Sequence, residues 1–368
     1  MKNSFILFMI LFILNCDSQS STVSLHLSRS NAITNAIKNN SSSVVGINVI
    51  TLDQKSYNHN KFWNNFFPYS LENNKIRSFG SGTIVSSDGY IITNAHVVDK
   101  SEEIIVTLEG GQRHLAKLVG IDRPTDIALL KIQDKNLPYF SIGDSDSIIV
   151  GEWVVAMGNP LALFDISNKP TATAGIVSGV GIDFGLRKSG QVYQNMIQTD
   201  ASINQGNSGG PLINSHGELI GINTFIMTGQ SGYNEGSVGI GFAIPSNLVY
   251  KVVEELKKNG KINRNYNTGL KVQKLDGVLA KYLRVKARGV LIQDVEFNSA
   301  GEEAGLKVGD VIVTVDSKEV ESPQDIIRVI SEGLHQVGDY IDLVIIRNNL
   351  NKSIKLKLEE PKSKYWGF

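Results

Sequence analysis

The stretch INQGNSGGPLIN (residues 203–214) places one serine, Ser208, between an asparagine and two glycines. A serine becomes a good nucleophile only when a neighbouring base removes its proton. Glycines let the surrounding backbone adopt φ values that side chains disfavour, so that N–H groups can point at a developing negative charge. The stretch therefore predicts a nucleophile turn in which Gly206 and Ser208 supply these N–H groups.

Two further motifs contain the partners that such a serine needs. His96 lies in IITNAHVVD, where an apolar strand pattern ends in small residues, although most single histidines are only structural. Asp126 directly precedes the apolar run at 127–132, a place where a carboxylate must be paired or point into solvent. The order His96, Asp126, Ser208 is that of the chymotrypsin-type catalytic triad.

Residues 206–210 also match G-x-S-x-G, the nucleophile elbow of α/β-hydrolases. That fold needs a helix directly after the serine and a histidine late in the chain. Here Pro211 and the sequence PLINSHGELIGIN predict strand, turn and strand instead. The sequence therefore favours the chymotrypsin-type arrangement.

Composition limits the class of protein. A chain of 368 residues is long enough for two domains, and its 36 basic and 36 acidic residues balance. We therefore expect no nucleic-acid partner. Short Val/Ile runs between frequent turn signals favour a mostly β protein. Because metal and nucleotide motifs are absent from the sequence, we expect no cofactor.

The amino end resembles a bacterial lipoprotein signal. The apolar run over residues 5–14 is too short to span a bilayer and stops close to Cys16, the only cysteine. Asn15 departs from the small residue that usually precedes such a cysteine. We expect a signal peptide over 1–15, lipidation of Cys16 and a flexible spacer over 16–30, with an ordinary secretory signal as the alternative. Export to the periplasm or cell envelope follows from either interpretation.

The rest of the chain divides into two blocks. The first spans residues 31–260: a short helix, strand-like runs as far as Ala243, and a closing helix in which Ser246 is the expected cap and Gly260 the end. The second spans 266–360. An aromatic tail over 361–368 follows it.

The second block has one clear helix signal, SPQDIIRVISEG. Ser322 and Asp325 are spaced as a capping box, Pro323 stands at the first turn and Gly333 follows the end.

The motifs GSGTIVSSDGYIITNAHVV, DRPTDIALLKI and TDASINQGNSGGPLIN together resemble the HtrA (Deg) family of secreted and envelope serine proteases. The resemblance covers about residues 31–360. It implies a chymotrypsin-like double β-barrel followed by a single PDZ domain. It also implies a trimer, with His96 as general base and acid, Asp126 as its orienter and Ser208 as nucleophile.

The same resemblance makes Gly206, Asn207 and Ser208 the oxyanion turn. Gln205 occupies a position where the family usually has proline. Because proline fixes φ and stiffens a turn, we expect glutamine to make this turn easier to switch off.

Substrate and regulatory residues are expected in two loops. Ile226 and Met227 are apolar candidates for the wall of a primary pocket that accepts small or medium aliphatic residues, or they are ordinary core residues. Arg187 lies in a glycine-flanked loop that is expected to report PDZ occupancy to the oxyanion turn, or it is a solvated surface charge. The aromatic segment at 62–69 is expected near the active-site mouth or between subunits.

PDZ domains bind a peptide's carboxyl end as an added strand. The expected peptide-binding residues are a carboxylate loop and one face of the predicted helix, which are Thr268, Gly269, Leu270, Ile326, Ile327 and Ile330. Packing inside the domain is the alternative for each isoleucine.

The resemblance thus implies a lipid-anchored envelope endopeptidase that degrades misfolded or exposed proteins and is regulated by carboxyl-terminal peptides at its PDZ domain. The alternative is a chaperone or peptide-binding scaffold in which proteolysis is latent.

Overall fold

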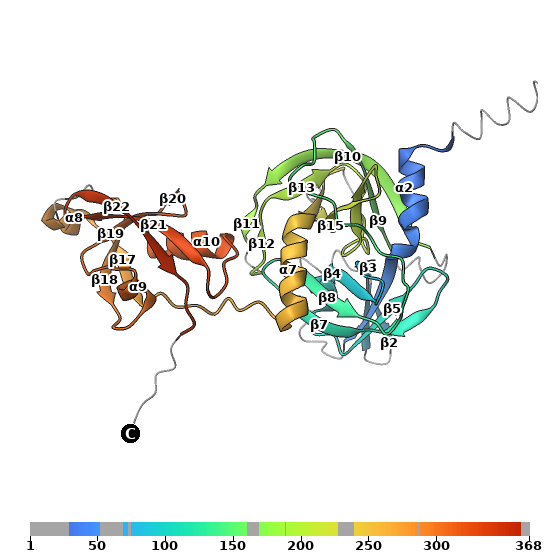
Figure 1. Cartoon of the computed structure of the whole chain (residues 1–368), viewed down its shortest axis with the longest axis horizontal. Coiled ribbons are helices and arrows are strands. Elements are labelled where there is room, and N and C mark those ends of the chain that lie inside the picture. Colours follow the sequence, from blue (N-terminus) through green and yellow to red (C-terminus); the bar gives the residue numbers. More distant parts are fainter. Residues whose placement is uncertain are drawn as a thin grey trace, which may run out of the picture. The chain divides into compact units, whose positions relative to one another are not determined.

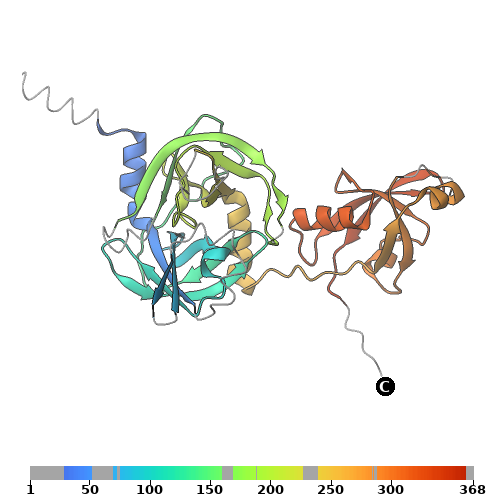
Figure 2. The ribbon, with the colours of Figure 1, turned by 180° about the vertical axis from the view of Figure 1, so that it is seen from behind.

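The computed structural model describes residues 29–51, 69–72, 75–159, 169–187, 189–226, 239–283, 285 and 288–361. They form two compact units (Figures 1 and 2). The larger unit contains most of the strands of the first block. The smaller unit contains the carboxyl-terminal sheet together with the segments 121–126 and 183–194.

The first half of the larger unit is an eight-stranded antiparallel sheet. Its order is β6-β5-β1-β3-β4-β8-β7, and β2 pairs with β3. The strands are β1 (Val44–Thr51), β2 (Tyr69–Glu72), β3 (Lys75–Ile84), β4 (Tyr90–Asn94), β5 (Glu103–Thr107), β6 (Arg113–Leu115), β7 (Lys117–Asp122) and β8 (Ile127–Lys131).

The second half is a closed barrel in the order β10-β13-β16-β15-β14-β9. A two-stranded hairpin, β11 (Gly185–Leu186) with β12 (Val192–Tyr193), follows β10. The barrel strands are β9 (Trp153–Gly158), β10 (Thr171–Ile182), β13 (Met196–Thr199), β14 (Pro211–Asn214), β15 (Leu219–Ile226) and β16 (Gly241–Pro245).

The strand cores explain why these segments pair. Residues 127–130 of β8 are all fully buried, as expected for a β-branched and aliphatic run with apolar neighbours on both faces. The strand-like runs expected after the first helix begin with β1. The mostly β architecture expected from the sequence is confirmed.

The helices flank these sheets. Asn31 caps α2 (Ala32–Asn40) with a full capping box, so the helix expected from residue 31 is confirmed. The short helix η1 (Ser41–Ser43) leads into β1. The remaining helices are α5 (Ala95–Val98), α7 (Ser246–Asn259), α8 (Gly277–Leu283), α9 (Ala300–Glu303) and α10 (Pro323–Glu332).

The closing helix α7 is confirmed, but the role expected of its first residue is wrong. Ser246 belongs to the helix, and its hydroxyl donates to the carbonyl oxygen of Gly143 at 2.7 Å. The orphan N–H of Asn247 is instead satisfied by Ser145 Oγ at 3.1 Å. At the other end Gly260 has φ +72, which is the expected glycine C-cap.

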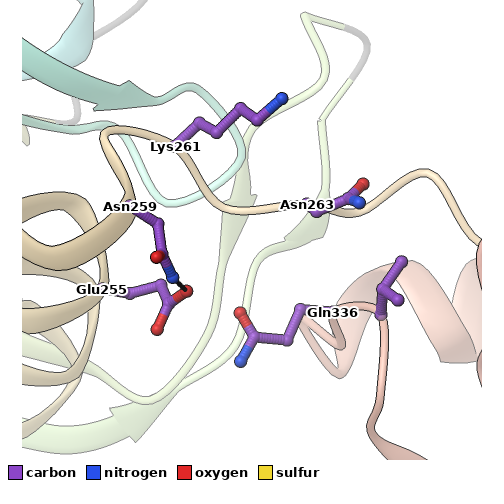
Figure 3. A pocket seen from close by; sticks show the side chains of 6 residues that line it. Glu255, Asn259, Lys261, Asn263 and Gln336 are labelled. Atoms are coloured by element: carbon purple, nitrogen blue, oxygen red, sulfur yellow. Dashed lines mark hydrogen bonds between the residues drawn. The ribbon is translucent and has the colours of Figure 1, made fainter.

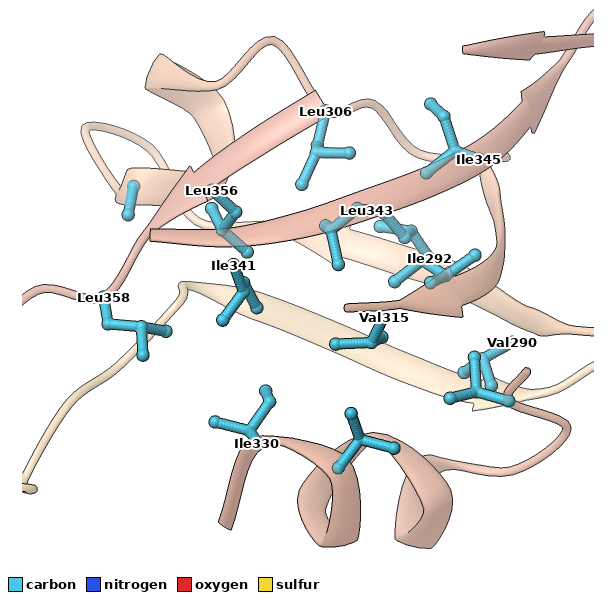
Figure 4. Packing of buried hydrophobic residues seen from close by; sticks show 14 residues of the cluster. Val290, Ile292, Leu306, Val315, Ile330, Ile341, Leu343, Ile345, Leu356 and Leu358 are labelled. Carbon is cyan, nitrogen blue, oxygen red and sulfur yellow. The ribbon is translucent and has the colours of Figure 1, made fainter. Parts of the chain in front are cut away.

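The carboxyl-terminal sheet has the order β17-β18-β19-β21-β22, with β20 paired to β19. Figure 4 shows its core, an apolar cluster to which Ile341, Leu343 and Ile345 of β21 and Ile330 of α10 all belong. The predicted capping box of α10 is present between Ser322 and Asp325. The strands are β17 (Leu270–Lys274), β18 (Val290–Val295), β19 (Val311–Val315), β20 (Lys318–Glu319), β21 (Tyr340–Arg347) and β22 (Leu350–Lys357).

Candidate active site

Ser208 lies in the loop between β13 and β14, in a segment that we call the nucleophile turn (residues 204–210). The side chain is 3% exposed. Its hydroxyl donates to the carbonyl oxygen of Thr224 in β15 at 2.8 Å. The single hydroxyl proton therefore points at a backbone carbonyl in this structure.

Hydrogen bonds fix most peptide groups of the nucleophile turn. The N–H of Asn207 donates to Asn204 at 3.0 Å, which closes a β-turn with Gly206 at its third position. Gly206 has φ +92, as a type II turn requires. The N–H of Gly210 donates to the carbonyl of Asn207 at 3.0 Å. Within the described residues, the N–H groups of Gly206 and Ser208 make no such bond.

Two glycines beyond the serine are required by close backbone approach. Gly209 has φ +85, and a Cβ there would collide with the carbonyl oxygen of Ser81 and the hydroxyl of Thr93. A Cβ on Gly210 would collide with the carbonyl oxygen of Met157. The absence of side chains at these two positions lets the turn fit between β3, β4 and β9.

His96 and Asp126 are brought to the same end of two paired strands. Asn94 of β4 pairs with Ile127 of β8, so the residues just beyond them in α5 and just before β8 are neighbours. A Cβ added to Gly80 would lie 2.7 Å from Val97 Cγ1 and 3.5 Å from the carbonyl oxygen of Ser208. Through this glycine the short helix that carries His96 and the nucleophile turn meet at β3.

Asp126 occupies an unusual backbone conformation. Its φ is +60 and it is fully buried, although left-handed non-glycine residues are uncommon and costly. Aspartate tolerates this region better than most residues. Such outliers cluster at functional sites, where surrounding structure holds them in place.

A tyrosine that the sequence did not indicate contacts this carboxylate. Tyr193 is 3% exposed, and its hydroxyl donates to Asp126 Oδ2 at 3.1 Å. Because a buried carboxylate needs donors, Tyr193 both satisfies and orients it. The only available sequence signal was a lone tyrosine in GQVYQNM, 67 positions away.

The residues expected in the substrate pocket are only partly described. The backbone of Ile226 ends β15 opposite Gly241, while its side chain and all of Met227 lie outside the described residues. Residues 62–68 and Cys16 also lie outside them. Arg187 is exposed at the β11–β12 hairpin, with its guanidinium 6.0 Å from the ring centroid of Phe184.

In the carboxyl-terminal sheet, the expected carboxylate loop (residues 268–270) is held by neighbouring residues. The N–H of Gly269 donates to Asn267 Oδ1 at 3.0 Å, and its carbonyl accepts from Glu296 at 2.8 Å. The carbonyl of Thr268 accepts from Gly301 at 2.9 Å. The N–H of Gly269 is therefore already used in this structure.

The three isoleucines of α10 differ in exposure. Ile330 is 7% exposed and belongs to the sheet core, where it supports the helix. Ile326 is partly buried against that core. Ile327 is 62% exposed. The structure therefore leaves Ile326 and Ile327 as the better candidates for contact with a peptide.

A separate polar pocket of about 350 Å³ lies in the smaller unit. Figure 3 shows that Asn259 donates to Glu255 on its wall. The lining residues include neither serine nor histidine, so the pocket differs in chemistry from the nucleophile turn. Its lining consists of Glu255, Asn259, Lys261, Asn263, Gln336 and Val337.

Two kinds of feature do not occur among the described residues. Within the described ranges, no helix is long and apolar enough to cross a bilayer. No group of three or more His, Cys, Asp or Glu side chains that could hold a metal ion occurs in those ranges either.

Comparisons with known proteins agree with this architecture. Residues 80–222 match the trypsin-like peptidase domain, and residues 267–358 match the PDZ domain. The chain is 41% identical over 306 residues to a probable periplasmic serine endoprotease DegP-like of Chlamydia muridarum, covering 79% of this chain and 57% of the relative. It is 41% identical over 289 residues to the periplasmic serine endoprotease DegP of Escherichia coli, covering 78% and 58%.

A solved structure is similar over almost its whole length. The HtrA-type protease AlgW with a decapeptide has a TM-score of 0.63 and 32% identity, covering 89% of this chain and 98% of that one. The chain spans a little over half the length of the curated relatives it matches.

Fold and matches together define the class, a trypsin-like peptidase domain followed by one PDZ domain. The chain belongs to the HtrA (Deg) family of serine proteases.

Proposed function

We propose that this chain is a serine endopeptidase of the cell envelope that cleaves misfolded or exposed proteins. The observation that carries the proposal is the nucleophile turn, in which a buried serine follows a type II turn and two N–H groups are left for an oxyanion. The names of the relatives, periplasmic serine endoproteases, support both the reaction and the compartment.

In the proposed mechanism Ser208 attacks the scissile carbonyl after its hydroxyl turns from Thr224 towards His96. His96 takes the proton and returns it to the leaving amine. Asp126, held by Tyr193, orients the imidazole and stabilises its charged form. The N–H groups of Gly206 and Ser208 bind the oxyanion, and water then releases the acyl group.

Replacement of the nucleophile tests this proposal. Ser208→Ala is expected to lower casein hydrolysis by roughly 10⁴-fold or more, while peptide binding is unchanged. The unfolding temperature should fall only slightly, because one hydrogen bond to Thr224 is lost. Ser202→Ala, in the same loop, is the matched control and should retain wild-type activity. Hydrolysis that persists in purified Ser208→Ala would refute the assignment.

Substrate choice is proposed to depend on Ile226 and Met227, which would form an apolar wall and favour cleavage after Val, Ala or Ile. A peptide library tests this proposal by the residue that precedes each cut. Dominant cleavage after Lys, Arg or Asp would exclude the apolar pocket.

The PDZ domain is proposed to bind carboxyl-terminal peptides beside β17. This strand is an edge strand among the described pairings, since it pairs only with β18. Its Leu270 and the helix residue Ile326 pack against one apolar cluster. Addition of a peptide strand at such an edge is the binding mode of this domain type.

Regulation is proposed to run from the occupied PDZ domain through Arg187 to the nucleophile turn, within a homotrimer anchored by lipid at Cys16. The exposed position of Arg187 leaves it able to meet another group. Arg187→Ala should then abolish stimulation by peptide. Equal stimulation in both proteins would exclude Arg187 from this role.

A peptide-binding scaffold with latent proteolysis is the second candidate. It is favoured by one observation, the hydrogen bond that directs the Ser208 hydroxyl to Thr224. Reaction with a fluorophosphonate in the presence and absence of a peptide with an apolar carboxyl end separates the two. Labelling only with peptide indicates latency, and equal labelling indicates an enzyme that is already competent.

A further inference from the structure

A second buried serine contacts the nucleophile turn. Ser81 lies in β3 and is fully buried. Its hydroxyl donates to the carbonyl oxygen of Gly206 at 2.6 Å and accepts from the N–H of Asn159 at 2.7 Å. Its own N–H donates to the carbonyl oxygen of Ser208 at 2.9 Å. One residue of the first sheet thus holds two carbonyls of the turn, on either side of Asn207.

The hydroxyl of Ser81 fixes one particular peptide group. The peptide between Gly206 and Asn207 has its N–H bonded to Asn204 and its carbonyl oxygen bonded to Ser81. Because a peptide group is planar, hydrogen bonds at both ends define its orientation. The oxyanion donor of Gly206 belongs to the next peptide upstream, which joins this one through the Gly206 Cα.

Glycine at this position makes the hydrogen bond from Ser81 important. Gly206 has φ +92 and no Cβ, so its backbone resists rotation less than that of any other residue. If the carbonyl oxygen were released, rotation about the φ and ψ bonds of Gly206 could change the angle between the two peptides, so that the N–H of Gly206 would no longer point at the oxyanion. Ser81 therefore does more than satisfy a buried carbonyl.

The packing around the hydroxyl leaves little room for a substitute. A Cβ on Gly158 would lie only 2.7 Å from Ser81 Oγ and 2.7 Å from Asn207 Oδ1. A water molecule in place of the hydroxyl would need space and several polar partners. Loss of the Ser81 hydroxyl therefore leaves the carbonyl oxygen of Gly206 without a hydrogen-bond donor.

We propose that Ser81 is a positioning residue that holds the oxyanion donor of Gly206 in its productive orientation through the Gly206 carbonyl. The inference rests on the proposed role of Ser208 as nucleophile. It predicts an effect on the transition state rather than on substrate binding, because an oxyanion develops only as the acyl carbon is attacked.

The chain offers a matched control two residues away on the same strand. Thr83 is also fully buried, and its hydroxyl donates to the carbonyl oxygen of Gly209 at 3.1 Å. Thr83→Val removes a buried hydrogen bond to the same turn with little change in shape. It leaves the peptide that follows Gly206 untouched.

The experiment measures kcat and KM of the full chain on a peptide substrate for Ser81→Ala and Thr83→Val, together with their unfolding temperatures. We expect Ser81→Ala to lower kcat by about 10- to 100-fold with KM unchanged, against about 100- to 1000-fold for complete loss of an oxyanion donor. The affinity for a peptide boronate, whose adduct places an oxygen in the oxyanion hole, should fall in parallel. Thr83→Val should keep its kcat, and it should lose less stability than Ser81→Ala, which also leaves the N–H of Asn159 without its acceptor.

If Ser81→Ala lowers kcat no more than Thr83→Val does, at a temperature where both variants are folded, Ser81 has only a structural role. If Ser81→Ala does not fold, Ser81→Cys replaces it, since the thiol keeps the packing and a weak donor. A kcat of Ser81→Cys below that of the wild type then supports the inference, and a wild-type kcat contradicts it. Ser208→Ala keeps the two questions apart, because activity that survives that change refutes the proposed nucleophile whatever Ser81 does.

Discussion

The nucleophile turn of the larger unit and the carboxylate loop of the PDZ domain are both glycine-containing turns expected to bind a negatively charged oxygen, yet they are held differently. In the first, the hydroxyl of Ser81 donates to the carbonyl oxygen of Gly206 from a separate strand. In the second, the side chain of Asn267 uses an N–H of the loop itself. A hydrogen bond that reaches a carbonyl of the turn from a separate strand leaves the N–H groups of the turn ready for an oxyanion. A loop whose N–H is already occupied must rearrange or rely on other donors.

Among the tests of this comparison, substitution of one glycine in each turn is expected to have the largest effect on activity or peptide affinity. In Gly209→Ala the new Cβ collides with Ser81 and Thr93 at φ +85. We expect peptidase activity to fall by about 1000-fold and stability by about 3 kcal/mol or more. Activity of folded Gly209→Ala within about ten-fold of wild type would show that the turn tolerates movement.

Gly269→Ala is the counterpart in the PDZ domain, where the Cβ collides with Ser299 at φ +70. Peptide affinity should fall by about ten-fold or more, while basal hydrolysis of a small peptide is unchanged. Peptide binding is measured by fluorescence anisotropy. Unchanged affinity would place the carboxylate elsewhere.

Tyr193→Phe tests the support of Asp126, the acid that we propose orients His96. The variant loses the hydrogen bond to Asp126 and keeps the ring. Because hydrogen bonds to charged groups are stronger than neutral ones, kcat should fall by about ten-fold at unchanged KM. Tyr139→Phe, at a tyrosine that is 54% exposed, is the control. Equal kcat in the two variants would mean that Tyr193 does not act through Asp126.

A smaller effect is expected from Gln205→Pro. Proline is favoured at the second position of a type II turn, which Gln205 occupies before Gly206. The substitution should stabilise the protein by about 0.5 kcal/mol and raise basal kcat by about two- to three-fold, because the turn spends more time in the productive form. A lower kcat in a folded variant would show that the glutamine is needed.

The smallest expected effect concerns the cap of α10. The hydroxyl of Ser322 and the backbone at Glu321 hold the pKa of the Asp325 carboxyl below its ordinary value. A lowered folded pKa means that this contribution to stability is present above the unfolded pKa and is lost as pH falls through the folded pKa. In Ser322→Ala the pKa of Asp325 should rise towards its ordinary value in an NMR titration, whereas Ser331→Ala should leave it unchanged. An unmoved pKa in Ser322→Ala would assign the shift to the backbone alone.

Local pattern explains which features could be predicted from the sequence. The glycines around Ser208, the apolar run after Asp126 and the spacing of Ser322 and Asp325 are all short-range signals. They led to the fold class, the α10 capping box and the order of the triad candidates. Each depends on backbone conformations that neighbouring residues decide.

Long-range contacts explain what the sequence could not predict. Ser81 bonds to Gly206 across 125 positions, and Tyr193 bonds to Asp126 across 67. No periodicity marks either residue, because each role arises only when separate strands pack. The prediction that Ser246 caps α7 is wrong for the same reason, since its hydroxyl donates to the carbonyl oxygen of Gly143 across 103 positions rather than bonding within its own helix.

The most direct test of the central claim is active-site labelling of the full chain with a fluorophosphonate, followed by mass spectrometry of its peptides. The account predicts covalent modification of Ser208, about one label per chain, in parallel with loss of casein hydrolysis, and no labelling of Ser208→Ala. Modification of another serine that accompanies the loss of activity, or full hydrolysis after Ser208 is labelled, would contradict it.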